Sequence, residues 1–420
     1  MSGEHGLKKH FTGETATILG RRLQKVLPDF DTPGYAAQVD RRVTGLELKD
    51  RVLVLAEGLR SRLPVDYPEA LELLRGTLGD ELPEGRGMFT ASWFLMPVAR
   101  YAEEYGLDHP AESLDFLEAV TRCHTAEYTV RPFLVRHREA TMERFGKWAL
   151  DSSRNVRRLA SEGLRPRLPW ARGLPFLVED PSPALKVLET LRADPSGYVR
   201  TSVANNLNDI SRDHPATVLE TARRWSRESP LPETAWIVRH ALRTLVRRGD
   251  QEALAVLGNT GGEHVRVRGL SVRPAALRLG DALTLRFAVE NTDTRAHRVT
   301  VDYVVHHVRA HGRRVPKVFK LSEVYLAPGQ VRHMEKTHRI RKIQTRQHYP
   351  GEHLVDVRVN GLPAGTDGFE LLPERAEWPG GSRRRTPRHP RPGAVRCRGS
   401  SGRRRAPGRG RPPGSFGRPR

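Results

Sequence analysis

One short segment of the chain, Arg154–Trp170, places charged side chains at helical spacing beside an aromatic residue. Read as a helix, it puts Arg158, Glu162 and Arg165 on one face, at positions i, i+4 and i+7. A Pro-bounded loop follows and ends at Trp170. A carboxylate between two guanidiniums, close to an indole, suits a site that binds a polyanion and needs a negative charge at one point. The opposite face is apolar and is formed by Val156, Leu159, Ala160, Gly163 and Leu164.

A second carboxylate, Glu127, lies one predicted repeat earlier. Arg131 follows Glu127 by four residues, just as Glu162 follows Arg158. Two interpretations are open: the two carboxylates converge on one site, or each forms a separate surface ion pair worth only about 0.3–0.5 kcal/mol. Pro132 permits a helix that starts there, which would leave Glu127 in the preceding loop. Spacing alone therefore leaves convergence undecided.

The elements that carry these residues are predicted to be helices, because apolar residues recur at three- to four-residue spacing throughout residues 1–258. Asp151 and Asp194 each lie five residues before a Val-Arg pair, and a Leu follows each Val by eight residues. Such an internal repeat is typical of HEAT-like helical pairs that stack into a solenoid; a non-repetitive helical bundle is the alternative. Val-Arg pairs occur at 130–131, 156–157, 199–200 and 238–239, and the clearest helical segments are Thr15–Leu27, Leu46–Leu63, Tyr67–Leu78 and Phe89–Tyr105.

The hydrophobic period changes to that of strands at about residue 263. Turn signals such as Ala327-Pro-Gly separate short runs rich in Val, Leu and Thr. Roughly seven short strands within about 110 residues predict an immunoglobulin-like β-sandwich over residues 263–372. The predicted strands are Val265–Val272, Ala282–Glu290, His297–Val308, Val315–Leu321 and Leu354–Val359.

The rest of the chain, residues 373–420, is rich in Arg, Pro and Gly and is predicted to be a disordered tail. From Trp378 onward it holds 14 Arg and no Lys, Asp or Glu, and so supplies most of the formal net charge of +22. Two interpretations are open: a flexible arm that binds phosphates, or the out-of-frame translation of a GC-rich gene. The moderately basic remainder favours an acidic partner such as nucleic acid.

The composition also excludes several classes of protein. Two cysteines, Cys123 and Cys397, give no disulfide framework and fit a reducing compartment. No Cys/His spacing predicts a metal site, and no metal or other cofactor is expected. The N-terminus lacks the apolar stretch of a signal peptide, and no run is long enough to span a membrane. The protein is therefore expected to be cytoplasmic.

Further basic residues are candidates for contacts with nucleic acid. Arg200 lies in the helix of the next repeat. Arg341 and Lys342 begin a basic run that extends to Arg346 and could reach a DNA groove, or could be a solvated strand edge that resists aggregation. Trp170 is equally ambiguous, because it is either an exposed contact residue or an aromatic that anchors a loop in the core.

Six blocks of sequence resemble a known family, the AlkC branch of the DNA alkylation-repair glycosylases. The helical blocks Ala126–Phe133, Arg157–Trp170 and Asp194–Asn208 are similar to its HEAT-like domain. The blocks Val301–His307, Pro316–Lys320 and Tyr349–Glu352 resemble the immunoglobulin-like domain that many members carry. The resemblance covers about residues 5–372, and the tail has no counterpart in it.

The resemblance implies a monofunctional DNA glycosylase that removes cationic N3-alkylated bases without flipping them out of the duplex. The substrates it implies are 3-methyladenine and, as a further candidate, 3-methylcytosine. Glu127 and Glu162 would be the catalytic carboxylates, and Trp170 and Arg158 would contact the lesion or its backbone, with Arg165 as a further DNA contact. The immunoglobulin-like domain would help to clasp the duplex. The expected partner is double-stranded DNA with alkylated bases, bound by a monomer at the nucleoid.

Elementary chemistry agrees with these roles. A base alkylated at N3 already carries a positive charge, so it can leave without a general acid. The enzyme then needs chiefly to stabilise a sugar cation and to position a water molecule, and a carboxylate can do both. The alternative from another class is a non-enzymatic HEAT-repeat scaffold for nucleic acid or protein, which needs no carboxylate between arginines. A third is a related repair protein that recognises branched or bulky DNA.

Overall fold

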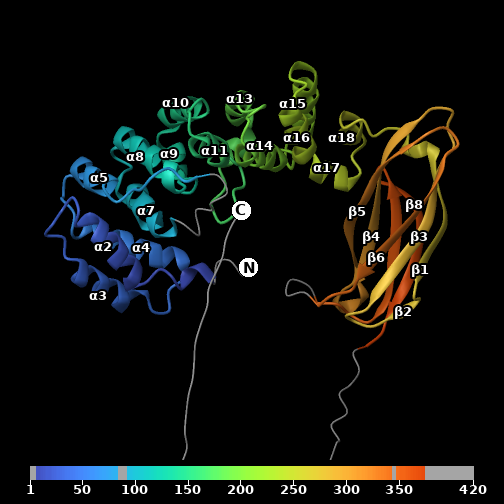
Figure 1. Ribbon diagram of the computed structural model, residues 1–420, viewed down its shortest axis with the longest axis horizontal. Coiled ribbons are helices and arrows are strands. Elements are labelled where there is room, and N and C mark those ends of the chain that lie inside the picture. Colours follow the sequence, from blue (N-terminus) through green and yellow to red (C-terminus); the bar gives the residue numbers. More distant parts are fainter. Residues whose placement is uncertain (1–5, 84–91, 343–346, 374–420) are drawn as a thin grey trace, which may run out of the picture. The chain divides into compact units, whose positions relative to one another are not determined.

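The computed structural model of the chain describes residues 6–83, 92–342 and 347–373, so the predicted tail beyond Pro373 lies outside the described residues. The described chain is helical as far as Val256 and forms strands from Val265 onward, which confirms the predicted fold class (Figure 1). The domain limits 1–258, 263–372 and 373–420 stay predictions. Among the described helices, none has the length and apolar character needed to cross a bilayer.

The helices of the N-terminal region follow the predicted pattern with shifted ends. They are α2 (Gly13–Leu23), α3 (Thr32–Val43), α4 (Leu48–Arg60), α5 (Tyr67–Arg75), α7 (Met96–Tyr105), α8 (Pro110–Cys123), α9 (Arg131–Arg136), α10 (Arg138–Trp148), α11 (Arg154–Glu162), α12 (Pro175–Glu179), α13 (Ser182–Thr190), α14 (Gly197–Ile210), α15 (Pro215–Glu228), α16 (Pro232–Ala241), α17 (Arg243–Arg248) and α18 (Gln251–Val256). Short 3₁₀ turns lie at Trp93–Leu95 and Gly262–His264.

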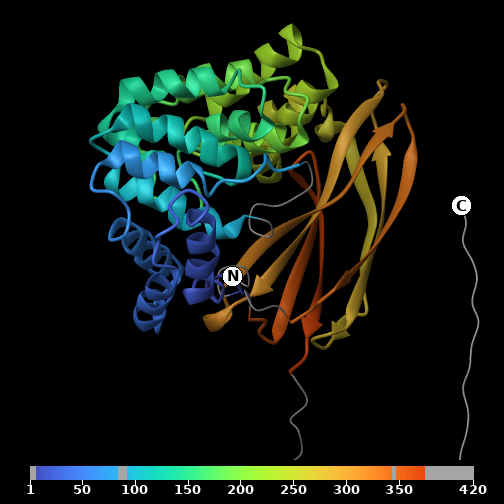
Figure 2. The same ribbon diagram turned by 60° about the vertical axis from the view of Figure 1, so that its left-hand side comes forward.

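Helices of successive repeats pack side by side. Helix α11 contacts α8 and α14, and α14 in turn contacts α16. Helices α10, α13 and α15 form a second row, which lies above them in the view of Figure 1. Seen from a second direction, the helices still follow one another in chain order (Figure 2). This stacking of neighbouring pairs confirms the helical-repeat prediction over the alternative of a non-repetitive bundle.

The Asp and Val-Arg repeat corresponds to a ladder of hydrogen bonds between neighbouring repeats. Asp194 accepts from the backbone N–H of Ser196 at 2.8 Å and from Arg157 Nε of the preceding repeat at 2.6 Å. Asp151 accepts from Ser153 N at 2.6 Å and from Arg122 at 2.8 Å in the same way. Each Asp therefore fixes the turn before its helix and ties that turn to the repeat before it.

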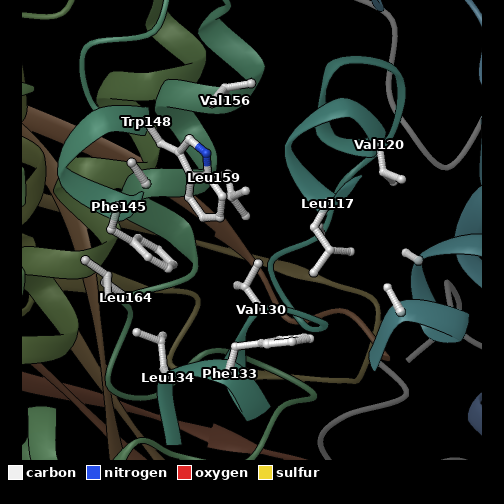
Figure 3. Packing of buried hydrophobic residues seen from close by; sticks show 14 of the residues in the cluster. Leu117, Val120, Val130, Phe133, Leu134, Phe145, Trp148, Val156, Leu159 and Leu164 are labelled. Carbon is white, nitrogen blue, oxygen red and sulfur yellow. The ribbon is translucent and has the colours of Figure 1, made fainter. Parts of the chain in front are cut away.

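The apolar face of α11 is part of the main core. Val156 and Leu159 are fully buried and pack close to the aromatic rings of Phe145 and Trp148 (Figure 3). Gly163 follows the last residue of α11, at a position where there is no room for a side chain. A Cβ there would lie 2.8 Å from a ring carbon of Phe145, so the helix can end close to the core only with glycine at this position.

The strands form two sheets that enclose a common core, as expected for a sandwich. The antiparallel three-stranded sheet has the order β1 (Val265–Arg273), β3 (Ala282–Asn291), β6 (Val331–Arg339). The five-stranded sheet has the order β2 (Ala276–Leu277), β8 (Leu362–Leu371), β7 (Gly351–Val359), β4 (His297–Val308), β5 (Arg314–Leu326). Side chains from both sheets, such as Phe287 of β3 and Val357 of β7, share one apolar cluster.

The ladder leads to a testable difference in stability. Replacing Arg157 by Met should lower the free energy of unfolding by about 2–3 kcal/mol, because Asp194 would stay buried without its cation. Urea denaturation followed by circular dichroism would measure this loss. Arg223 is the matched control, because its pair with Glu252 is largely exposed, and Arg223→Met should cost about 0.5 kcal/mol or less. Equal losses in the two variants would contradict a structural role for the ladder.

Candidate active site

Two short elements bring the predicted carboxylates into the same region. Glu127 lies in a turn between α8 and α9, because α9 begins at Arg131 with Pro132 in its first turn. Glu162 is the last residue of α11. The helix ends there, and Arg165 lies at the start of the Pro-bounded loop, with its guanidinium still beside Glu162.

Arg158 joins the two carboxylates. Its Nη1 lies 2.6 Å from Glu127 Oε2, and its Nη2 lies 3.5 Å from Glu162 Oε1. Glu162 Oε1 also lies 2.7 Å from Arg165 Nη1. The side chains of Glu127, Glu162 and Arg158 are only 5%, 8% and 12% exposed. The interpretation as two separate surface ion pairs is therefore wrong: one buried network links both carboxylates, and Glu127 pairs with Arg158 rather than with Arg131.

The electrostatics of this network keep Glu162 ionised. Burial alone would raise the pKa of the Glu162 carboxyl, but Arg158 and Arg165 outweigh burial and hold that pKa below its ordinary value. For Arg158, burial would lower the pKa, but Glu127 and Glu162 together raise it above the ordinary arginine value. The neighbouring phenol of Tyr128 has a raised pKa, chiefly through burial and then through the charge of Glu127. The site therefore holds fixed charges in a region with little water.

Three further side chains complete the network and were missed by the sequence analysis. Ser202 of α14 donates from its hydroxyl to Glu162 Oε2 at 2.6 Å. Asp209, also on α14, accepts from Arg165 Nε at 2.8 Å. Thr125 accepts from Arg158 Nη1 at 3.1 Å. Ser202 and Asp209 lie one repeat away from Glu162, so only the stacking of α11 on α14 brings them to it.

Trp170 lies at the surface of the loop that follows α11. Its side chain is 53% exposed, so the interpretation as a core aromatic is wrong. Its backbone has a positive φ of 64°, a conformation that non-glycine residues adopt rarely and that is often found near functional sites. The Nζ of Lys49 donates to the carbonyl of Trp170. The indole is therefore presented outward by a fixed backbone.

A cavity of about 590 Å³ lies next to this loop. Trp170, Thr125 and Tyr128 line it, and Thr125 also accepts from Arg158, so the turn that carries Glu127 contacts both the cavity and the charged network. His124 also lines it, and burial lowers the pKa of this imidazole to about 3, which leaves it neutral. The walls also contain apolar and charged side chains; the apolar ones are Leu48, Val52, Met96, Ala99, Leu107, Val135 and Leu174, and the charged ones are Lys49, Arg100, Glu103, Arg131, Arg136 and Arg172.

The remaining predicted contacts lie apart from this network. Arg200 donates to the carbonyls of Asp194 and Pro195 at 3.0 and 2.7 Å, the same type of contact that Arg157 makes with its own turn. Arg341 and Lys342 are exposed after the end of β6, and Arg346 lies outside the described residues. The roles of Arg200, Arg341 and Lys342 in DNA binding stay predictions. Within the described ranges, no cluster of three or more His, Cys, Asp or Glu could hold a metal ion.

Comparison with known proteins shows which proteins this chain is similar to. Residues 266–373 match the family model described as "Uncharacterised protein YhaZ, C-terminal Ig-like domain". The chain is 36% identical over 366 residues to "Uncharacterized protein YhaZ" of Bacillus subtilis (strain 168), a match that covers 87% of this chain and 99% of that protein.

A solved structure shows the same similarity over most of the chain. It is "Pseudomonas fluorescens alkylpurine DNA glycosylase AlkC bound to DNA containing an abasic site analog", with 37% identity and a TM-score of 0.79. The match covers 87% of this chain and 99% of that chain. These findings confirm the resemblance to AlkC and the immunoglobulin-like character of the sandwich.

The lowered pKa of Glu162 predicts how stability depends on pH. A carboxyl whose pKa is lower in the folded state stabilises the fold above its unfolded pKa of about 4.3, and this stabilisation is lost as the pH falls through the folded value. The difference in free energy of unfolding between wild type and Glu162→Gln should therefore be largest above about pH 5 and shrink below about pH 4. Chemical denaturation at a series of pH values measures it, and a difference that stays constant from pH 3 to pH 7 would contradict the assignment.

Proposed function

The chain belongs to the family that contains YhaZ and AlkC, and on this premise we propose that it is a DNA glycosylase that hydrolyses the N-glycosidic bond of alkylated bases. The proposed substrates are cationic N3-alkylated bases in double-stranded DNA, with 3-methyladenine first and 3-methylcytosine as a further candidate. The proposed enzyme acts as a monomer, without a cofactor and without flipping the base.

The observation that carries this proposal is the convergence of two buried carboxylates on one guanidinium. Glu127 and Glu162 come from successive repeats and contact the same residue, Arg158. A scaffold that only binds nucleic acid needs cations on its surface. Its packing can use a buried carboxylate in the turn before a helix, as at Asp194, but two costly buried carboxylates on one guanidinium are not part of that ladder. Their retention therefore favours a chemical task.

The task that fits is stabilisation of a sugar cation. As the C1′–N bond of a cationic nucleotide breaks, its electron pair goes to the base, which leaves neutral, and positive charge develops on the sugar. A fixed carboxylate stabilises that charge, and the second carboxylate can orient a water molecule that adds to C1′ and releases a proton. Glycoside hydrolases use paired carboxylates in a related way, but there one of them must protonate the leaving group.

Arg158 and Arg165 have a different proposed role, which is to hold the geometry. Two carboxylates close together repel each other, and one would become protonated unless a cation lay nearby. Arg158 sits between them and lies over the ring of Tyr198, with 5.1 Å between its Cζ and the ring centroid. Glu162, whose pKa these two arginines hold below its ordinary value against the effect of burial, can then stay ionised until the substrate cation forms. Trp170, exposed at the edge of the site, is proposed to contact the lesion with its π face.

The proposed role of the two carboxylates can be tested by substitution. Glu162→Gln and Glu127→Gln should each lower the release of 3-methyladenine by about 100-fold or more, because the sugar cation loses a fixed negative charge. Single-turnover reactions on methylated DNA, with the free bases separated by chromatography, measure this rate. Affinity for an undamaged duplex should stay close to that of wild type.

Glu139→Gln serves as the control for these variants, because Glu139 is exposed on α10, away from the network. It should release base at the wild-type rate. A Glu162→Gln protein that retains full activity would overturn the assignment of that residue. A wild-type protein that binds DNA but releases no base would favour the non-enzymatic scaffold.

A second prediction concerns the charge of the leaving base. Neutral adducts such as ethenoadenine, and uracil, should be released at least about 100-fold more slowly than 3-methyladenine, because they need a proton that the proposed mechanism does not supply. Oligonucleotides with a single defined lesion would be compared under identical conditions. Comparable rates for cationic and neutral bases would refute the mechanism.

A further inference from the structure

Arg131 is a buried arginine whose hydrogen bonds go to backbone carbonyls. Its Nη1 donates to Gly163 O at 3.0 Å and to Arg165 O at 2.9 Å, and its Nη2 donates to Arg172 O at 2.7 Å. The residue is 5% exposed. A buried cation is costly unless something offsets its desolvation. Here the offset comes from three carbonyl dipoles, since no ion pair with a carboxylate is found for it among the described residues.

These three carbonyls lie at the two ends of one loop. Gly163 and Arg165 directly follow Glu162 at the C-terminus of α11, where a cation also interacts favourably with the helix dipole. Arg172 lies at the far end of the loop, two residues after Trp170. One guanidinium therefore closes the segment 163–172 into a loop. The N–H of Leu174, which donates to Pro166 O at 3.0 Å, closes it further.

Arg131 differs in this respect from other arginines of the Val-Arg repeat. Arg157 and Arg200 donate to carbonyls in the turn just before their own helix, and so serve the ladder. Arg131 reaches instead into the next repeat, 32 to 41 residues further along the chain. Val130-Arg131 is a Val-Arg pair like those at 156–157 and 199–200. The side chain of Arg131, however, makes its contacts around the candidate active site.

The position of Arg131 in the chain gives these contacts their significance. It lies four residues after Glu127, at the start of the short helix that ends the Glu127 turn. Its guanidinium holds the residue after Glu162 and the far end of the Trp170 loop. Burial, and then the charge of Arg165, lower the pKa of Arg131 to about 10, so it remains charged at neutral pH.

We propose that Arg131 is a positioning residue, which fixes Glu162 and the Trp170 loop relative to Glu127 and so sets the geometry in which the three act on the substrate. Where the test measures the release of base, this inference rests on the proposed function. It assigns Arg131 no contact with DNA or with the reacting atoms. Misplacement of catalytic groups by about 1 Å can reduce a rate on the order of 100-fold, so a change at Arg131 should act on kcat rather than on DNA affinity.

The main test compares Arg131→Lys and Arg131→Met with Arg144→Met. Lys keeps the charge but cannot reach three separated carbonyls, and Met keeps much of the volume without any donor. Arg144 on α10 pairs with Asp115 at 2.6 Å, away from the loop, and serves as the matched control. We expect both Arg131 variants to lose about 10- to 100-fold in the single-turnover rate, with unchanged affinity for undamaged duplex, and the control to keep its rate.

A double-mutant cycle separates positioning from general destabilisation. Because Arg131 is proposed to hold the Trp170 loop as well as Glu162, part of the loss caused by Arg131→Lys should disappear in a Trp170→Ala background, so that the loss becomes smaller there. Equal losses in both backgrounds, or a wild-type rate for Arg131→Lys, would overturn the proposal. Melting temperatures of all variants show whether each protein is folded at the assay temperature.

A third measurement does not depend on enzymatic activity. The loop contains Arg167 and Arg172, which are cleavage sites for trypsin, whereas Arg165 is not one because Pro166 follows it. If Arg131 holds the loop closed, these sites should resist trypsin in the wild-type protein, and Arg131→Lys should increase their cleavage at least about 10-fold. Rapid cleavage of the wild-type loop would refute the proposal. If the wild type releases no base at all, the proposed function fails while this test of Arg131 still stands.

Discussion

The contact of Arg158 with both Glu127 and Glu162 is the interaction on which the arrangement of the site depends. Two buried carboxylates would repel each other or take up a proton, and a guanidinium between them removes both problems. The contact also joins a turn of one repeat to a helix of the next. Ser202 and Asp209 then attach the network to a third repeat. The charge network and the packing of the solenoid are therefore parts of one structure.

Arginine serves two purposes in this chain, and local sequence does not separate them. In the ladder, Arg157 bonds to a buried aspartate and to carbonyls of its own turn, which sets the spacing of the repeats. In the site, Arg158 is the next residue along the same helix and pairs with glutamates. Neighbouring positions on a helix point about 100° apart. One short helix can therefore carry a structural arginine and a functional arginine side by side.

Much of the fold followed from periodicity, because burying one face of a helix or strand imposes a repeat of 3.6 or 2 residues on the sequence. The pairing of Asp194 with Arg157 was visible as a repeat, although its physical meaning was not. The site was harder to predict, since spacing could not show whether Glu127 faces Glu162. Ser202 could not be found, because its contact with Glu162 spans 40 residues and exists only through helix packing.

Few positions of helix α11 can be exchanged, because each of its nine residues has a contact that depends on its side chain or on its small size. Val156, Leu159, Ala160 and Ser161 are buried in the stack, and Asn155 and Arg154 bond to backbone carbonyls near its start. The remaining three positions hold the ladder and the charge network. A stretch with so few interchangeable positions works as a fingerprint: in an unfamiliar genome, it would separate proteins that can build this charge network from those that share only the stacked helices.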